Sequence, residues 1–167
     1  QHRLEIVTCE EEKPKKHFLD SDIKLIYDTL SHFLHGTQID ILSQDSAGNK
    51  FIFFSYTDRN PGTYYLYQRD NGKITSLGNI NSSIKPEDLC AMEPISFKSR
   101  DGLVINGYLT LPKRNKITDL PVVVLPHDGP WRYRDNWRYS DEVQFLANRG
   151  YAVFQVNYRG SAGYGKE

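Results

Sequence analysis

Two glycine-bearing segments near the end of the chain carry the residue types that could do chemistry. The first, residues 127–131 (HDGPW), directly follows the apolar run 121–126. The second, residues 157–165 (NYRGSAGYG), directly follows the apolar run 151–156. Because glycine has no Cβ, its backbone can bend sharply and come close to a substrate. Both segments are therefore candidates for loops that present backbone N–H groups at the end of a strand.

Backbone N–H groups in such loops have a use in ester and amide hydrolysis. Hydrolysis by a serine enzyme passes through a tetrahedral oxyanion, and losing one N–H donor typically costs about 2.7–4 kcal/mol of transition-state stabilisation. In α/β-hydrolases one donor comes from a glycine-rich loop after the third strand. The first segment retains Gly129, whereas Pro130 removes a donor. Asp-Gly-Pro is also ordinary turn chemistry, so this segment alone is a weak signal.

The second segment is less generic, because its nine residues include three glycines, two tyrosines and one arginine. Arg159 has two interpretations. Its guanidinium could hold a substrate carboxylate through two hydrogen bonds, or it could bond backbone carbonyls and tie loops together, which we favour. Residues 160–165 lack the Gly-x-Gly-x-x-Gly spacing and the Gly-Lys-Ser/Thr end of phosphate-binding loops, so we predict no nucleotide site.

No nucleophile, acid or base can be assigned within the chain. Ser161 is not predicted to be the nucleophile, because Arg159 stands where the Gly-x-Ser-x-Gly nucleophile elbow has its first glycine. Ser140 precedes a helical pattern and is interpreted as its N-cap. We predict structural roles for all five histidines, since none has an evident triad partner: His2, His17, His32, His35 and His127.

The elements that position the two loops form a strand, a helix and a second strand. The β-branched run 121–125 is typical of a strand buried on both faces. A helix is expected from Ser140 to Gly150, and residues 152–156 form the next strand. This order predicts a right-handed crossover between parallel strands. Before it, the Asp101-Gly102 turn predicts a hairpin of residues 95–98 and 103–111.

The first half of the chain has a different pattern. A strand at 3–9 and the start of a partner strand at 17–19 precede an amphipathic helix at about 22–34. Asp20 or Ser21 can cap this helix, and Gly36 can end it. Four short runs with turn residues in every gap then predict an antiparallel meander: 38–43, 51–56, 63–68 and 74–77.

Two architectures fit a four-stranded meander. It can be one blade of a β-propeller, which needs neighbouring blades to bury both faces. It can also be an isolated antiparallel sheet covered by the preceding helix. The polar stretch 79–93 is the best domain boundary in either case.

Composition excludes several classes of protein. The 167 residues hold 21 basic and 21 acidic side chains, so a nucleic-acid or anionic-membrane partner is not expected. No apolar run approaches the roughly 18 residues that span a bilayer. The two cysteines, Cys9 and Cys90, fit no metal-ligand spacing and are interpreted as unpaired thiols. The chain starts at Gln1, with neither an initiator Met nor a signal-peptide pattern. Because it is expected to begin inside a longer protein, the compartment, cytoplasmic or exported, is undetermined.

Residues 121–166 resemble the opening of the catalytic domain of the prolyl oligopeptidase family, in its dipeptidyl aminopeptidase/acylaminoacyl peptidase branch. That branch carries HGGP, an aromatic-rich loop and NYRGSTGYG, where this chain has HDGP and NYRGSAGYG. Residues 92–111 resemble the segment that leads into this domain. Residues 37–90 are similar to the last propeller blade of the family, and residues 1–36 to a piece just before it.

The resemblance implies a mixed fold of two domains. Residues 1–90 would be the C-terminal part of an antiparallel, all-β propeller domain with one helix. Residues 91–167 would be the N-terminal part of an α/β-hydrolase (peptidase) domain. The rest of the parent chain would be needed for a complete fold, and this piece alone is expected to be marginally stable.

The implied activity is that of a serine peptidase acting on short peptides, without a cofactor or a metal. The Ser-Asp-His triad of the family is expected beyond this fragment, which would be inactive by itself. Two alternatives stay open: an esterase or acyl-peptide hydrolase of the same fold, and a noncatalytic propeller that serves as a binding module.

The resemblance also assigns two loops. The oxyanion-hole loop carries over to His127, Asp128, Gly129 and Pro130. An active-site-proximal structural loop carries over to Tyr158, Arg159, Gly160 and Ser161. Asp128 departs from the glycine of the family, and a carboxylate aimed at a developing oxyanion would repel it. We therefore expect Asp128 either to point away or to alter the activity.

Overall fold

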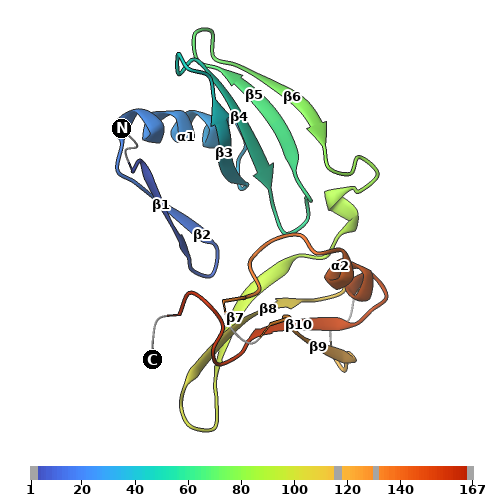
Figure 1. Ribbon diagram of the computed structural model, residues 1–167. Helices are drawn as coiled ribbons and strands as arrows, with labels where there is room; N and C mark the ends of the chain where they lie inside the picture. The colour runs from blue at the N-terminus through green and yellow to red at the C-terminus, as the bar shows by residue number, and fades with distance from the viewer. Residues whose placement is uncertain (1–3, 115–117, 130–131, 165–167) are drawn as a thin grey trace. The chain divides into compact units, whose positions relative to one another are not determined.

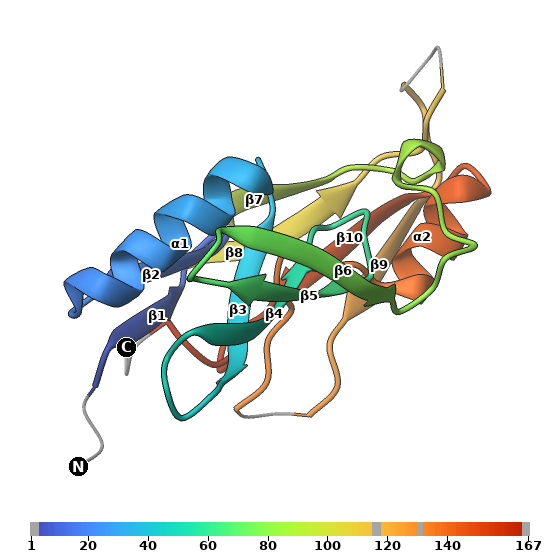
Figure 2. The same ribbon diagram turned by 90° about the horizontal axis from the view of Figure 1, so that it is seen from above.

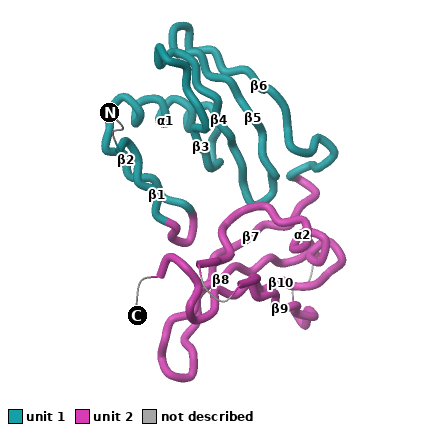
Figure 3. The backbone as a smooth tube through the Cα atoms, in the orientation of Figure 1, with its two compact units in different colours: residues 1–9, 14–86 teal, residues 10–13, 87–167 magenta. Residues whose placement is uncertain are grey.

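The structure is a computed structural model that describes residues 4–114, 118–129 and 132–164. Most of its regular structure is β-strand, and antiparallel pairing predominates. The chain divides into two compact units, residues 1–9 with 14–86 and residues 10–13 with 87–167 (Figure 3). Each unit has a four-stranded sheet and a buried cluster of its own.

The helix of the first unit, α1 (Ser21–Phe33), forms where the apolar period predicts it. The Asp20 carboxylate accepts hydrogen bonds from the N–H groups of Asp22 and Ile23, at 2.8 and 3.2 Å. This satisfies two of the donors that the first helical turn leaves unpaired. Gly36 follows the helix with a φ of +73°, a conformation that glycine adopts without steric cost. The predicted cap and end of the helix are confirmed.

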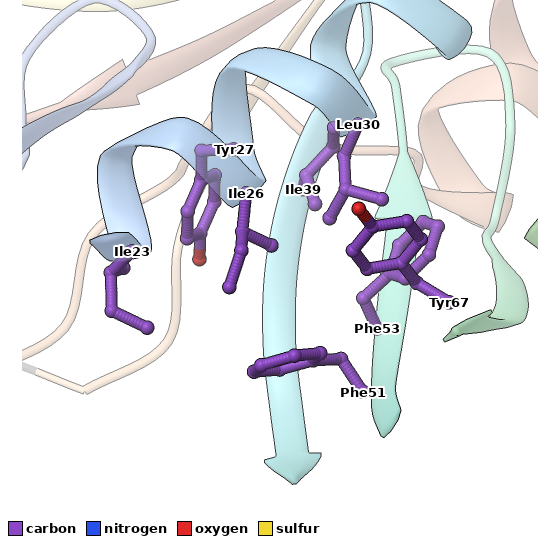
Figure 4. Packing of buried hydrophobic residues seen from close by; sticks show 8 residues of the cluster. All are labelled: Ile23, Ile26, Tyr27, Leu30, Ile39, Phe51, Phe53 and Tyr67. Carbon is purple, nitrogen blue, oxygen red and sulfur yellow. The ribbon is translucent and has the colours of Figure 1, made fainter. Parts of the chain in front are cut away.

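The sheet of the first unit is the predicted meander. Its strands are β3 (Gln38–Gln44), β4 (Lys50–Tyr56), β5 (Thr63–Gln68) and β6 (Lys73–Asn79), paired antiparallel in chain order (Figures 1 and 2). Helix α1 covers one face of this sheet, as the second of the two architectures predicts. Side chains of the helix and of the sheet form one buried cluster (Figure 4): Ile23, Ile26, Tyr27, Leu30, Ile39, Phe51, Phe53 and Tyr67.

Aromatic residues also stand on the opposite face of the meander. Successive side chains of a strand alternate between the two faces, so Phe54 and Tyr56 lie away from α1. The ring centroid of Phe54 lies 5.7 Å from that of Tyr56 and 4.9 Å from that of Tyr64. Gly62 lies so close that a Cβ there would come within 1.9 Å of the Phe54 ring. Both faces of the sheet therefore carry large apolar side chains.

A short hairpin precedes α1. Its strands are β1 (Ile6–Glu10) and β2 (Pro14–Phe18), and Ile6 and Phe18 pack against the buried cluster of the first unit. The first strand begins at Ile6 and the second at Pro14, whereas the sequence predicted starts at 3 and 17; residues 1–3 lie outside the described residues.

Residues 10–13, at the turn of this hairpin, belong to the second unit. The Arg134 guanidinium donates to the carbonyl oxygens of Glu10 at 2.9 Å and of Glu11 at 3.3 Å. The Lys13 ammonium lies 4.1 Å from the centroid of the Trp137 ring, within the range of a cation–π contact. Glu10, Glu11 and Lys13 therefore take partners from a part of the chain more than a hundred positions away.

The sheet of the second unit is mixed. Its strands lie in the order β7 (Met92–Lys98), β8 (Val104–Thr110), β10 (Ala152–Asn157), β9 (Val122–Pro126). The predicted hairpin is confirmed as β7 and β8, and β9 and β10 are parallel as predicted. The pairing of β8 with β10 is antiparallel, so the sheet around the crossover is not a purely parallel one.

Helix α2 (Asp141–Asn148) connects β9 to β10 and lies beside β10 (Figures 1 and 2). Its N-cap is Ser140, as predicted, whose Oγ accepts from the N–H of Val143 at 3.4 Å. The buried Gln144 exchanges two hydrogen bonds with the backbone of Cys90, at 2.9 and 2.8 Å. These two hydrogen bonds hold Cys90, which follows the 3₁₀ turn η1 (Pro86–Asp88) near the start of the unit, against α2.

The prediction that residues 121–125 form a strand buried on both faces is wrong. Val122 and Val124 are 59% and 57% exposed, while Leu125 packs against the buried cluster under α2. The reason is one-sided packing: among the described residues, α2 and its cluster cover the face of β9 that carries Leu125, and the two valines lie on the other face. Among the described residues no helix is long and apolar enough to cross a bilayer.

Candidate active site

The two glycine-bearing loops begin at neighbouring positions of the sheet. Strand β9 ends at Pro126, and Pro126 is paired with Val156 of β10, one residue before that strand ends. Since the two strands are parallel, the loops that follow them leave from the same edge. The parallel pairing predicted for the two strands therefore brings the starts of both loops to one edge of the sheet.

His127 connects the first loop to the second. Its ring stacks on that of Tyr158, with centroids 4.3 Å apart and an angle of 17° between the planes. Its Nδ1 lies 3.1 Å from the carbonyl oxygen of Asp128, which can only accept, so Nδ1 carries a hydrogen. Its Nε2 lies 2.7 Å from the Ser161 hydroxyl, which donates to it when the imidazole is neutral.

This contact gives His127 a serine partner that the sequence did not reveal. It does not form a catalytic triad, because Nδ1 faces a backbone carbonyl, where a triad has a carboxylate. Ser161 is 8% exposed, and its own N–H donates to the carbonyl of Tyr158 at 3.0 Å. A buried serine held in this way is consistent with the prediction that Ser161 is not a nucleophile.

The Tyr158 hydroxyl holds the backbone of the first loop. It lies 2.6 Å from the carbonyl oxygen of Gly129 and 3.2 Å from that of His127, so its single hydrogen is shared between them. Gly129 has a φ of +77°, and a Cβ there would come within 2.5 Å of the Tyr133 ring. This position therefore needs glycine for both its conformation and its space. Pro130, the fourth residue predicted for this loop, lies outside the described residues.

Arg159 reaches a side chain at the turn between β7 and β8. Its guanidinium forms an ion pair with the Asp101 carboxylate, and both side chains are more than half exposed. The hydrogen bond from Arg159 is the largest of the causes that lower the pKa of Asp101. Arg159 thus ties two loops together as we favoured, but through a carboxylate and not through backbone carbonyls. Gly160, next to it, has a φ of +95° and turns the loop back towards Ser161.

A third segment, residues 133–135, completes the site and was not predicted. The Asp135 N–H donates to the Asn157 side chain at 2.7 Å, and the Asn157 amide donates back to the Asp135 carbonyl at 3.1 Å. The Ala162 N–H donates to the carbonyl of Tyr133 at 2.9 Å. A buried asparagine at the end of β10 was the available signal, because it must find partners beyond its own strand.

Asp135, next to this site, has a carboxyl whose pKa is raised. Burial raises the pKa of its carboxyl, against the opposing effects of a 2.8 Å hydrogen bond from Gln155 and of His127 and Arg134 nearby. Its second oxygen, Oδ2, and the Gln155 Oε1 are both buried without a partner among the described residues. Two unpaired acceptors close together favour the protonated carboxyl over the carboxylate.

A pocket of about 420 Å³ lies beside the second loop. Its walls combine apolar residues of the β7–β8 turn and β8 with Tyr158, Arg159 and Ser161. Within the described ranges, no cluster of three or more His, Cys, Asp or Glu side chains could hold a metal ion. Chemically, the two loops can offer backbone N–H donors, and the pocket adjoining them can accommodate part of an uncharged or anionic ligand.

Comparison with known proteins finds relatives in one family of peptidases. A sequence model of the prolyl oligopeptidase family matches residues 137–167. The chain is 40% identical over 114 residues to dipeptidyl aminopeptidase BIII of Pseudoxanthomonas mexicana. This match covers 64% of this chain and 16% of that protein. It is 34% identical over 136 residues to dipeptidyl peptidase family member 6 of Caenorhabditis elegans, covering 69% of this chain and 18% of that protein.

Among solved structures, the acylaminoacyl peptidase of Pyrococcus horikoshii is similar to this chain. The TM-score is 0.54 and the identity 28%, over 74% of this chain and 19% of that one. The chain thus spans less than a fifth of the length of each of these relatives. The segment matched by the family model includes the second loop of the candidate site, residues 157–165. The chain belongs to the prolyl oligopeptidase family.

Proposed function

We propose that this chain is part of a serine peptidase that hydrolyses peptide bonds of short peptides. The observation that carries the proposal is the meeting of the 127–129 loop with the 157–161 loop at the ends of two parallel strands. The similarity to dipeptidyl aminopeptidase BIII supports it. The Ser-Asp-His triad would be supplied by parts of the protein outside these 167 residues.

The proposal assigns an architecture to each part of the chain. Residues 1–90 would be the C-terminal part of a β-propeller domain, with β3–β6 as one blade. The apolar side chains on both faces of the meander support this, since a blade is covered by its neighbours on both sides. Residues 91–167 would be the N-terminal part of an α/β-hydrolase domain, which the β9–α2–β10 crossover supports.

In the reaction, the serine hydroxyl adds to the peptide carbonyl, whose oxygen becomes negatively charged. His127, Asp128, Gly129 and Pro130 would form the loop that stabilises this charge through backbone N–H groups. Tyr158, Arg159, Gly160 and Ser161 would hold that loop from the side. The pocket beside Tyr158 would accommodate part of the substrate.

The experiment is a substrate comparison with the full-length protein. Arylamides of dipeptides, acyl-peptides and simple aryl esters are supplied in parallel, and a serine-directed phosphonate tests for an active nucleophile. We expect release of the arylamine from the dipeptide substrates and loss of that activity after phosphonate treatment. Turnover of esters alone would show an esterase. The absence of both turnover and labelling would show a noncatalytic binding protein.

Asp128 can be examined in the same assay. Its side chain is exposed, and its carbonyl is engaged by His127. If its carboxylate opposes the developing oxyanion, Asp128→Gly raises kcat by several-fold, because a like charge close to the reacting oxygen is removed. An unchanged kcat would mean that the carboxylate points away from the reacting group.

A further inference from the structure

We infer that Tyr158 and His127 are positioning residues that turn the N–H groups of Asp128 and Gly129 to one side of their loop, as the donors for the oxyanion. The inference rests on the proposed function and specifies how its oxyanion loop is held. Ser161 has a supporting role, because it fixes the His127 ring.

The inference begins with three consecutive carbonyl groups. The carbonyl of His127 and that of Gly129 both accept from the Tyr158 hydroxyl, at 3.2 and 2.6 Å. The carbonyl between them, that of Asp128, accepts from Nδ1 of His127 at 3.1 Å. Because the Tyr158 and His127 rings are stacked on each other, all three carbonyls turn towards one pair of rings.

The direction of the carbonyls determines the direction of the N–H groups. No cis peptide bond occurs in the described chain, and in a trans peptide the C=O and N–H point in opposite directions. The Asp128 N–H shares its peptide unit with the His127 carbonyl, and the Gly129 N–H shares its unit with the Asp128 carbonyl. Both N–H groups therefore point away from the ring pair.

These two donors are available for a ligand. Across the described residues, neither N–H donates to a backbone or side-chain acceptor. The next peptide unit ends at Pro130, which has no N–H, so the run of donors that begins at Asp128 ends at Gly129. Gly129 has a positive φ and Asp128 does not, and this alternation of sign is that of backbone nests that bind anions.

Ser161 holds the ring of His127 in the orientation that the Asp128 carbonyl requires. That carbonyl can only accept, so Nδ1 carries the hydrogen, and the Ser161 hydroxyl at 2.7 Å from Nε2 donates to the other nitrogen. Without this hydroxyl the ring would lose the hydrogen bond that fixes its orientation, and the bond from Nδ1 to the Asp128 carbonyl would weaken. The serine therefore acts through the histidine and does not need to touch a substrate.

The test is the Tyr158→Phe variant of the full-length protein, with Tyr139→Phe as its matched control. The Tyr139 hydroxyl likewise donates a hydrogen bond, in its case to the Asp141 carboxylate at 2.7 Å, and this bond involves neither loop. Both variants lose one hydroxyl and one hydrogen-bond donor. For Tyr158→Phe we expect kcat to fall about tenfold with KM within about twofold, because removing a whole oxyanion donor typically costs 10²–10³ in kcat and misdirecting one costs less.

A second measurement reads the loop without relying on activity. Amide hydrogen exchange of the peptide that contains residues 157–162 should become faster in Tyr158→Phe, and unchanged in Tyr139→Phe, because the hydrogen-bonded amides of Ser161 and Ala162 lose protection when the two loops are no longer tied together. Ser161→Ala should change exchange and kcat in the same direction. Thermal melting of each variant shows whether the protein is still folded, and Ser161→Ala replaces Tyr158→Phe if that variant does not fold.

The outcomes separate the inference from the proposed function. An active wild type whose kcat is unchanged by Tyr158→Phe overturns the inference and leaves the peptidase assignment in place. A raised KM with unchanged kcat also overturns it, since the tyrosine would then act in substrate binding. An inactive wild type overturns the peptidase assignment. In that case unchanged exchange at residues 157–162 in Tyr158→Phe would overturn the restraint as well.

Discussion

Replacing Asp135 by asparagine should stabilise the protein at neutral pH. In the wild type the carboxyl accepts one hydrogen bond from Gln155, while its Oδ2 and the Gln155 Oε1 are buried and find no partner in the described part of the chain. The variant keeps an oxygen for Gln155 and replaces the other one by an NH₂ group, which is a donor. It also removes the charge that burial disfavours.

The magnitude follows from the unpaired atoms. Leaving a buried polar atom without a partner costs about 1–3 kcal/mol, and the site is only partly buried, so we expect a gain of about 1 kcal/mol. For a protein of this size that corresponds to a rise in Tm of roughly 2–4 °C.

The gain should depend on pH in a defined direction. The pKa of Asp135 is raised above its ordinary value of 3.8 by burial. The stability that the protonated carboxyl contributes is therefore fully present below pH 3.8 and is lost as the pH rises through the higher folded-state pKa. The difference in Tm between Asp135→Asn and the wild type should accordingly be small in acid and grow towards neutral pH.

The assay is thermal unfolding of both proteins in a series of buffers of constant ionic strength. A difference in Tm that is the same at every pH would mean that the carboxyl titrates alike in the folded and unfolded protein. A difference that is largest in acid would reverse the sign and refute the reasoning about burial.

Three further predictions concern the packing, the loop and the surface. Leu30→Ala should lower the free energy of unfolding by about 2–5 kcal/mol in a denaturant titration, because Leu30 is fully buried, whereas the 60% exposed Leu25 should tolerate alanine within about 0.5 kcal/mol. Gly129→Ala should destabilise more than Gly36→Ala in the same titration; both pay about 1–2 kcal/mol for a positive φ, but a Cβ at Gly36 meets open space. The pKa of Asp101 is lowered from 3.8, so its carboxylate contributes stability that is present above pH 3.8 and is lost as the pH falls. Asp101→Asn should therefore make the free energy of unfolding less dependent on pH in acid. A pH dependence as steep as that of the wild type would count against the ion pair with Arg159.

Local patterns were sufficient to predict much of the fold. The spacing of Ile23, Ile26 and Leu30 predicts α1, and Asp20 supplies the cap that the structure shows. These features depend on contacts within a few residues, which a sequence displays directly. The exposed face of β9 was not predictable in this way, because the position of a strand in its sheet depends on pairing with distant segments.

The candidate site was also predictable from the sequence only in part. The meeting of the two loops follows from the parallel order of β9 and β10, which the strand–helix–strand pattern predicts. The contact between His127 and Ser161 spans 34 positions and depends on the path of both loops, so no local pattern announces it. Asp135 was missed for a related reason: only the folded structure shows that its carboxyl is buried beside Gln155.

The contacts of residues 10–13 have a consequence for the order in which the protein folds during synthesis. The Glu10 carbonyl accepts a hydrogen bond from the guanidinium of Arg134, which lies 124 positions later in the chain. This bond cannot form until Arg134 has been synthesised. At a synthesis rate of about 5–20 residues per second, the ribosome needs roughly 6–25 s to make the segment between them. The turn of the first hairpin therefore leaves the ribosome long before its partners exist. A chain arrested before residue 134 should leave this turn open to proteases, even where the helix and meander of the first unit have already formed.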